Sequence, residues 1–470
     1  MIIDAVMFVF NILMAFADSF WGLPMLLITG FIAVVYTIEN RGFQFTHFGY
    51  AIRETLGKTM KVQSSCVNER GITSFKALCM ALSNTIGVGN IAGVSLAIAL
   101  GGPGAVFWIW IAGVLGMIIK YGEIVLGCKY HEIDPKTGMY YGGIMWYIEK
   151  GLGEKWKWLA SIYAVVYILS GINGPGVQVN TLATSVTAYF NIPSMLIGII
   201  LSVLIGAVLL GGLKRISEFA GKVVPMMSVM YMVITATIVI IYIRQVPEII
   251  LLILRCAVSD CQAVAGGFGG ASAAMAIRYG IARGFYSNGA GTGDSPFAHS
   301  SVDVSHPSEQ GIWGIAEVAV DTLVCTGTAL MVLLTGVWQT GESGAPLTAS
   351  AVSIAFHSEA FGNVFIILMV LFFSLTTAIM SAYYGEVSLK FFTKRNTSII
   401  VYRFIVCLYV VFCTNTVFVE RLDIVWRIAD FNTIIAMVVS ITSLFLLRKD
   451  VAECTKEYKE IVKRRKKQHI

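Results

Sequence analysis

One segment determines how this chain must fold: Ala81-Leu82-Ser83-Asn84-Thr85-Ile86-Gly87-Val88-Gly89-Asn90-Ile91-Ala92-Gly93. It lies within an apolar run long enough to cross a bilayer, yet it carries glycine, asparagine, threonine and serine where a continuous helix would carry Leu or Ile. We therefore predict that the helix is interrupted at membrane depth. Lipid cannot satisfy free amides and carbonyls, so such backbone must be buried in protein or line a wet cavity. The interruption is accordingly a candidate ligand site.

The composition indicates an all-α integral membrane protein. The 470 residues are 56% hydrophobic and 13% charged, whereas globular proteins carry about 25% charged residues. Nine cysteines are dispersed singly, which argues against a disulfide framework and a metal knuckle. The net charge of +6 resides in loops and in the tail, so it indicates membrane topology and lipid contact rather than nucleic-acid binding.

Windows of about 20 residues predict eleven transmembrane crossings. They cover residues 21–38, 74–100, 104–127, 158–189, 195–213, 223–243, 258–280, 311–337, 362–391, 399–417 and 431–447. We expect residues 1–20 to form an interfacial segment, 21–450 the transmembrane domain and 451–470 a basic cytoplasmic tail.

The basic residues predict the orientation in the plasma membrane. Most of the 34 Lys and Arg residues fall in the tail and in loops on one side. Loops on the other side hold only Arg244, Arg255, Arg421 and Arg427. Because cytoplasmic loops are enriched in Lys and Arg, we expect the N-terminus outside and the C-terminus inside.

A second glycine-rich segment predicts a second interruption. The seventh crossing contains four glycines within Gly266–Gly270, too flexible for an unbroken helix. Its position five crossings after the first predicts an inverted repeat of five plus five helices, preceded by one extra helix. The alternative is that these glycines only allow close helix packing.

Interrupted helices expose groups that can hold a zwitterion. We expect amides following Gly87-Val88-Gly89 to bind a carboxylate, and carbonyls around Gly266–Gly269 to bind an ammonium group. Oxygen donors for a sodium ion stand at similar depth in Ser83, Thr85 and Asn90, and in Thr376 and Thr377; in the threonine pair, bonding to the carbonyl one turn back is the alternative. The sixth crossing holds no Lys, Asp, Glu or His, which favours sodium over proton coupling.

Several motifs resemble the alanine or glycine:cation symporter family. They are Ala81–Val94, Ala97–Trp108, Ile277–Gly284, Ser287-Asn288 and Tyr383–Glu386, and the likeness covers roughly residues 20 to 450. The resemblance implies a leucine-transporter-like fold and sodium-driven uptake of small amino acids, with no enzymatic activity.

The resemblance also implies roles for individual residues. It assigns the substrate carboxylate to the backbone around Gly87, Val88 and Gly89, with Asn90 and the carbonyl of Thr85 facing the substrate or a second ion. Gln178 matches a substrate-contacting glutamine of the family, and Phe268 would cover the pocket. Gly267 and Gly269, beside Phe268, belong to the carbonyls expected to bind the ammonium group. It assigns a sodium ion to the carbonyls of Ser83 and Ile86 and the hydroxyls of Thr376 and Thr377.

Two departures from the family pattern bear on the substrate. Ser381 stands where the family usually has tryptophan, which removes a wall of an alanine-sized pocket unless Met380 refills part of it. Asp294 stands where a small residue is typical. We therefore expect a substrate broader than alanine and glycine, with a larger or polar side chain.

Charged residues within the crossings have structural alternatives. We expect Glu317 and Asp321 to pair with Arg278 or Arg283. Lys120 and Glu123 are expected to form a pair at the cytoplasmic face.

Asp294, His299, Asp303 and His306 follow one another in an inside loop and leave a metal site open, although a gate or cap explains them equally well. The competing functions are a proton-coupled carrier, a membrane enzyme using this loop and a transport-dead sensor. The oligomeric state is open, a monomer being compatible with all of these.

Overall fold

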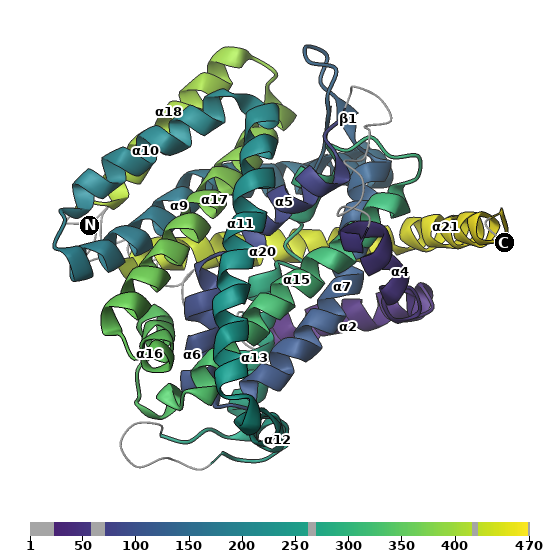
Figure 1. Cartoon of the computed structure of the whole chain (residues 1–470). Helices are drawn as coiled ribbons and strands as arrows, with labels where there is room; N and C mark the ends of the chain where they lie inside the picture. The colour runs from purple at the N-terminus through teal and green to yellow at the C-terminus, as the bar shows by residue number, and fades with distance from the viewer. Residues whose placement is uncertain (1–22, 58–70, 262–268, 416–421, 469–470) are drawn as a thin grey trace, which may run out of the picture.

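The computed structural model describes residues 23–57, 71–261, 269–415 and 422–468. The expected N-terminal interfacial segment lies mostly outside these residues. Helices dominate what is described (Figure 1). The helices are α2 (Leu23–Glu39), α3 (Phe43–Thr46), α4 (Phe48–Ile52), η1 (Arg53–Gly57), α5 (Ser74–Thr85), η2 (Gly89–Gly93), α6 (Val94–Gly101), α7 (Ala105–Lys129), α8 (Ile144–Leu152), η3 (Glu154–Trp156), α9 (Lys157–Phe190), α10 (Ser194–Leu210), α11 (Gly212–Ile241), η4 (Ile243–Gln245), α12 (Val246–Val258), α13 (Ala273–Asn288), α14 (Ser295–His299), α15 (Pro307–Leu334), η5 (Val337–Gln339), α16 (Gly344–Phe356), α17 (Glu359–Phe392), α18 (Asn396–Cys413), α20 (Leu422–Leu446) and α21 (Arg448–Gln468). Two short strands, β1 (Glu132–Ile133) and β2 (Tyr140–Tyr141), pair antiparallel.

Seven helices in the described residues are long and apolar enough to cross a membrane: α7, α9, α11, α15, α17, α18 and α20. The bent pair of α5 with η2 and α6 makes an eighth span. Two further apolar helices, α2 and α10, are shorter at 17 residues each. The protein is therefore a multi-pass membrane protein.

The helices bury one face in a common core and leave another toward lipid. The pairs α9 with α17, α7 with α15 and α13, and α10 with α18 lie in contact, and Figure 1 shows α10 and α18 side by side at one edge. Large apolar side chains such as Val203, Ile240 and Phe404 are more than half exposed. In a membrane protein this exposed apolar surface faces hydrocarbon rather than water.

The C-terminal helix α21 extends away from the bundle (Figure 1). Its near end is held to the core because Thr455 donates to Asn40 Oδ1 at 2.7 Å and bonds the Tyr121 hydroxyl at 2.9 Å. It follows directly on α20, so the start of α20 lies at the opposite end of the bundle. The start of α20 and helix α21 thus mark the two ends of the bundle.

Candidate binding site at two interrupted helices

The first interruption, between α5 and α6, is confirmed. Helix α5 ends at Thr85, and Ile86 takes extended backbone angles of φ −81° and ψ 92°. Helical turns resume in η2 and continue into α6, and the two halves are bent by 52°. The last carbonyls of α5 and the first amides after Gly87 thus lie where the helical hydrogen-bond series stops.

Asn90 organises this interruption. Its Oδ1 accepts a hydrogen bond from the Gly87 amide at 2.9 Å. Its Nδ2 donates to Asp321 Oδ1 at 2.6 Å and to Ser287 Oγ at 3.0 Å. The side chain is fully buried. Asn90 therefore links the Gly87 backbone to α13 and α15 rather than facing the cavity.

Among the residues proposed for sodium, Ser83 and Ile86 stand at the end of α5, and the two threonines of α17 differ in whether they reach them. Thr377 Oγ1 donates across to the Ser83 carbonyl at 2.9 Å, whereas Thr376 Oγ1 donates to the Phe372 carbonyl of its own helix at 2.9 Å. Ile86 is buried beside them in extended backbone. Thr377 is thus the hydroxyl that meets the interruption directly.

The structure corrects the predicted position of the second interruption. Gly267 and Phe268 lie outside the described residues, and Gly269 is exposed with no atom within 4 Å of a built Cβ. The adjoining chain forms an antiparallel bridge between Cys261 and Ala271 before α13 begins. Helix α13 begins at Ala273, so Gly269 and Gly270, the described glycines of the run, precede the helix instead of dividing it; a glycine-rich stretch is compatible with either position because glycine weakens a helix.

The second unwound stretch lies between α13 and α14. Gly289, Gly291 and Gly293 have φ angles of 61°, 90° and 77°, the left-handed region that favours glycine. Glu123 Oε1 accepts hydrogen bonds from the amides of Gly291 and Gly293, each at 3.0 Å. A carboxylate from α7 therefore already holds the amides at this interruption.

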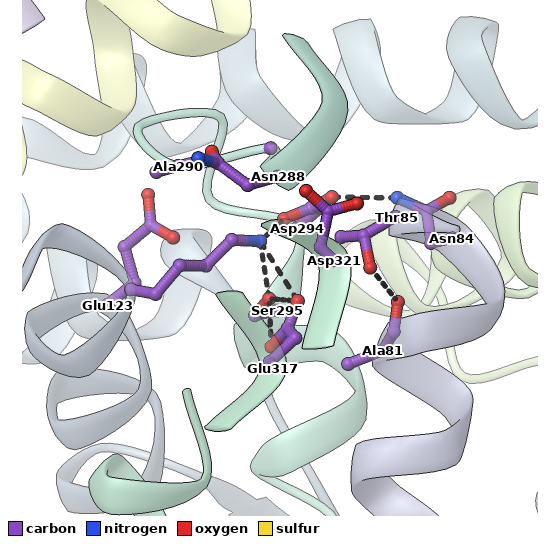
Figure 2. Close-up of polar contacts among 12 residues, drawn as sticks. Ala81, Asn84, Thr85, Glu123, Asn288, Ala290, Asp294, Ser295, Glu317 and Asp321 are labelled. Atoms are coloured by element: carbon purple, nitrogen blue, oxygen red, sulfur yellow. Dashed lines mark hydrogen bonds and ion pairs between the residues drawn. The ribbon is translucent and has the colours of Figure 1, made fainter. Parts of the chain in front are cut away.

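A buried charge cluster stands behind this stretch (Figure 2). Lys120 is fully buried, and its Nζ lies 2.6 Å from Asp294 Oδ1, 2.6 Å from Ser295 Oγ and 3.3 Å from Glu317 Oε1. The prediction of a surface pair between Lys120 and Glu123 is wrong, because this part of α7 packs inside the bundle. The cation neutralises two carboxylates that would be costly at this depth.

Glu317 and Asp321 do not pair with Arg278 or Arg283, which corrects a second prediction. Glu317 contacts Lys120, and its Oε2 lies 3.3 Å from His299 Nε2. Asp321 accepts hydrogen bonds from Asn90 and Ser287. Both arginines instead line the cavity beside the two interruptions.

A cavity of about 1110 Å³ opens along the two interruptions. Its walls come from α5, η2, α9, α13, α17 and α20 and from residues 343–346. Both Asp430, near the start of α20, and residues 343–346, next to α16, line it. The cavity therefore reaches toward the end of the bundle opposite α21.

The structure brings most of the predicted substrate residues to this cavity: Thr85, Gly87, Val88, Gly89, Gln178 and Ser381 line it, together with Thr377. Ser83, Ile86, Asn90 and Thr376 lie buried behind the wall. Gln178 carries a buried Oε1 atom without a hydrogen-bond partner in the described part of the chain. The arrangement offers amides for an anion and oxygen atoms for a cation at one site.

A metal centre in the loop after α13 gains no support from the arrangement of its side chains. Among the described residues, no three His, Cys, Asp or Glu side chains are grouped so as to hold an ion. His299 is buried, with Nδ1 2.6 Å from Gln310 Nε2. His306 lies 3.4 Å from Glu457 of α21.

Sequence reasoning missed the second interruption and its charges, although a signal was present. Gly289, Gly291 and Gly293 alternate as Gly87 and Gly89 do. Lys120 and Glu123 stand three residues apart, which places them on one face of α7. Glycine alternation combined with charges in an apolar helix would have indicated this second unwound stretch.

Comparison with known proteins identifies the class. The model of the sodium:alanine symporter family matches residues 6–470. The "Uncharacterized transporter YflA" of Bacillus subtilis is 34% identical over 94% of this chain and 92% of its own length. The "Sodium/alanine symporter AgcS" of Methanococcus maripaludis is 32% identical over 94% of this chain and 96% of its own.

A solved structure agrees in fold. MhsT in complex with L-phenylalanine superposes with a TM-score of 0.54 and 12% identity, over 83% of this chain and 99% of that chain. At this identity the likeness concerns the fold only. It agrees with the leucine-transporter-like fold that the sequence resemblance implies.

Proposed function

The chain belongs to the sodium:alanine symporter family, and from this premise we propose that it is a sodium-coupled amino-acid symporter working by alternating access. The observation that carries the proposal is the interrupted span of α5 and α6, bent by 52° in the wall of the cavity. Amides at such an interruption suit a carboxylate, and the carbonyls that end the other half suit a cation.

In this proposal the substrate carboxylate binds at Gly87, Val88 and Gly89, and Thr85 and Gln178 contact the rest of the amino acid. The unpartnered Oε1 of Gln178 supports this role, because a buried acceptor is expected to find a donor when ligand binds. The sodium ion binds the carbonyls of Ser83 and Ile86 with the hydroxyl of Thr377, and Thr376 completes the set by rotating from its own helix.

We propose eleven crossings, with α2 as the extra helix and the following ten as an inverted repeat of five plus five. In this proposal α5 and α6 make up the second crossing and α13 and α14 the seventh, and the interruption within each of these pairs supports it. With the N-terminus outside, the cavity reaches the outer face. The described conformation would then be open to the outside.

The test is uptake by purified protein in liposomes, with labelled amino acids and a sodium gradient present or absent. We expect accumulation only with the gradient. Binding without accumulation would identify a sensor, and substrate conversion without a gradient would identify an enzyme.

The substrate side chain is tested by Ser381→Trp. Ser381 lines the cavity close to α9, with its Cβ 3.1 Å from a Cβ built on Gly174. An indole here would narrow the pocket, so we expect this variant to retain alanine and glycine and to lose larger amino acids. Unchanged competition by the larger amino acids would contradict the enlarged pocket.

Coupling to protons instead of sodium is the alternative, and the buried carboxyl of Asp321 favours it. Asp321 is buried and faces only the neutral donors Asn90 and Ser287 among the contacts of the described residues, and a buried carboxyl in a membrane span commonly has a functional role. Uptake driven by a pH gradient without sodium, and abolished by Asp321→Asn, would support this alternative.

A further inference from the structure

A hydrogen-bonded polar surface closes the cavity on the side of Lys120. We call it the polar wall and define it as Asn84, Asp294, Ser381 and Tyr384, all of which line the cavity. Asn84 Nδ2 donates to Asp294 Oδ2 at 2.7 Å, and Ser381 Oγ donates to Asn84 Oδ1 at 3.4 Å. Figure 2 shows Asn84 and Asp294 turned toward each other from separate elements.

The polar wall adjoins the proposed carboxylate and sodium sites along the chain. Asn84 lies in the last turn of α5, three residues before Gly87, and Ser381 follows Thr377 by one turn of α17. One turn of helix rises about 5.4 Å. An amino acid whose carboxylate meets Gly87 can therefore direct its side chain to this wall.

The wall retains unused hydrogen-bonding capacity. Asp294 accepts from Asn84 and Lys120, and an ionised carboxylate has about four lone-pair sites. The Tyr384 hydroxyl is buried and has no hydrogen-bond partner among the described residues. Its ring stacks on Phe297 with centroids 5.0 Å apart, and the Phe297 amide donates to the Asp294 carbonyl at 3.1 Å. Tyr384 thus packs against the segment that carries Asp294, and both residues line the same cavity.

The charge of the wall limits what it can accept. Lys120 is already shared between Asp294 and Glu317, so the wall as defined offers no cation of its own to an acidic side chain; Arg278 and Arg283 line the cavity outside the wall. An apolar side chain would leave the buried Tyr384 hydroxyl without a partner and the spare lone-pair sites of Asp294 unused. A neutral group that donates one hydrogen bond and accepts another matches the Asp294 acceptor and the Tyr384 donor.

We propose that Asp294 and Tyr384 are specificity-determining residues that select a neutral hydrogen-bonding side chain, a carboxamide or a hydroxyl. The side-chain donor binds Asp294, and Tyr384 donates to the side-chain oxygen. This inference rests on the proposed function, since it needs an amino acid bound at Gly87.

The test uses isosteric amino-acid pairs as competitors of uptake in liposomes. Asparagine is compared with leucine, and threonine with valine. For each pair we take the ratio of inhibition by the polar member to inhibition by the apolar member. A larger ratio for asparagine over leucine indicates a carboxamide, and a larger ratio for threonine over valine indicates a hydroxyl. We expect the polar member of at least one pair to compete about tenfold better, and glutamate and aspartate to compete poorly. Tyr384→Phe should bring that ratio close to one while the sodium dependence stays unchanged.

The matched control is Tyr402→Phe, because the Tyr402 hydroxyl donates to the Ala382 carbonyl and does not line the cavity. It should leave both ratios as they are. Asp294→Asn should raise competition by glutamate relative to glutamine. Equal competition within both pairs, or a ratio that Tyr384→Phe does not change, would overturn the inference while sodium-driven uptake stands. Absence of uptake for every amino acid would overturn the proposed function and this inference together.

Discussion

The two interrupted helices hold their free amides in opposite ways. At the first, the Gly87 amide is bound by Asn90, a neutral side chain from the same segment. At the second, the amides of Gly291 and Gly293 are bound by Glu123, a carboxylate from another helix. A neutral acceptor is more easily exchanged for a ligand carboxylate than a buried charge is. The first interruption is therefore suited to a substrate, whereas the second already contains its own anion.

Charge balance extends this contrast. The second interruption is surrounded by Lys120, Glu123, Asp294 and Glu317, with Lys120 as the cation that touches Asp294 and Glu317. The first relies on hydroxyls, on the amides of Asn84 and Asn90, and on the carboxylates of Asp294 and Asp321 that accept from them. We expect variants at the second interruption to affect folding first and variants at the first to affect ligand and ion binding.

The largest expected effect is that of Lys120→Met. It leaves Asp294 and Glu317 buried without their cation, and breaking a buried ion pair in this way costs about 3–5 kcal/mol. Thermal unfolding in detergent should show a large loss of stability. Lys129→Met is the matched control on the same helix, because Lys129 and Asp450 are both partly exposed, and exposed pairs contribute about 0–1 kcal/mol. Equal stability of the two variants would contradict the central role of Lys120.

Glu123→Ala should have the next largest effect. It removes the acceptor of the Gly291 and Gly293 amides, and a buried donor left without a partner costs about 1–3 kcal/mol. We expect lower thermal stability and weaker uptake. Glu123→Gln retains an acceptor oxygen and should recover part of both. If Gln behaves as Ala does, the carboxylate charge rather than its hydrogen bonds holds the loop.

These two regions also differ in how far the sequence predicted them. The first interruption could be predicted because weak helix formers gather within one apolar run, a local property of Ser83 to Gly89. The second was placed wrongly, because the glycine run of 266–270 is denser than that of 289–293, and the alternation of Gly289, Gly291 and Gly293 becomes informative only when it is combined with the charges of Lys120 and Glu123. Partners such as Lys120 and Asp294 lie 174 residues apart in sequence, beyond the reach of any local pattern.

The number of spans shows a similar limit. Seven helices and one bent pair are clear from length and apolarity. Helices α2 and α10 are shorter, and α13 holds Arg278 and Arg283. These arginines line the cavity and lower the hydropathy of α13, so length and apolarity alone do not mark this helix as a span.

Thr377→Ala is expected to act on ion binding rather than on folding. Thr377 bonds the Ser83 carbonyl across the interruption, while Thr376 bonds its own helix. We expect Thr377→Ala to raise the sodium concentration for half-maximal uptake about tenfold, equivalent to about 1.4 kcal/mol, and Thr376→Ala to raise it less. Sodium titrations of uptake would measure both. A larger effect for Thr376 would mean that its hydroxyl leaves its own helix to bind the ion.

The smallest expected effect distinguishes the two glycines of the first interruption. A Cβ on Gly87 would lie 3.1 Å from Thr377 Oγ1, whereas a Cβ on Gly89 would meet nothing closer than the Tyr286 ring at 3.8 Å. The Thr377 hydroxyl can shift by a few tenths of an ångström, so Gly87→Ala should cost about 1 kcal/mol, at the low end of overpacking. We expect a severalfold higher substrate KM for Gly87→Ala and a near-normal KM for Gly89→Ala. Because the shifted hydroxyl is also the proposed sodium ligand, the KM of Gly87→Ala should improve with rising sodium. A KM defect independent of sodium would place the clash on the substrate side of the interruption.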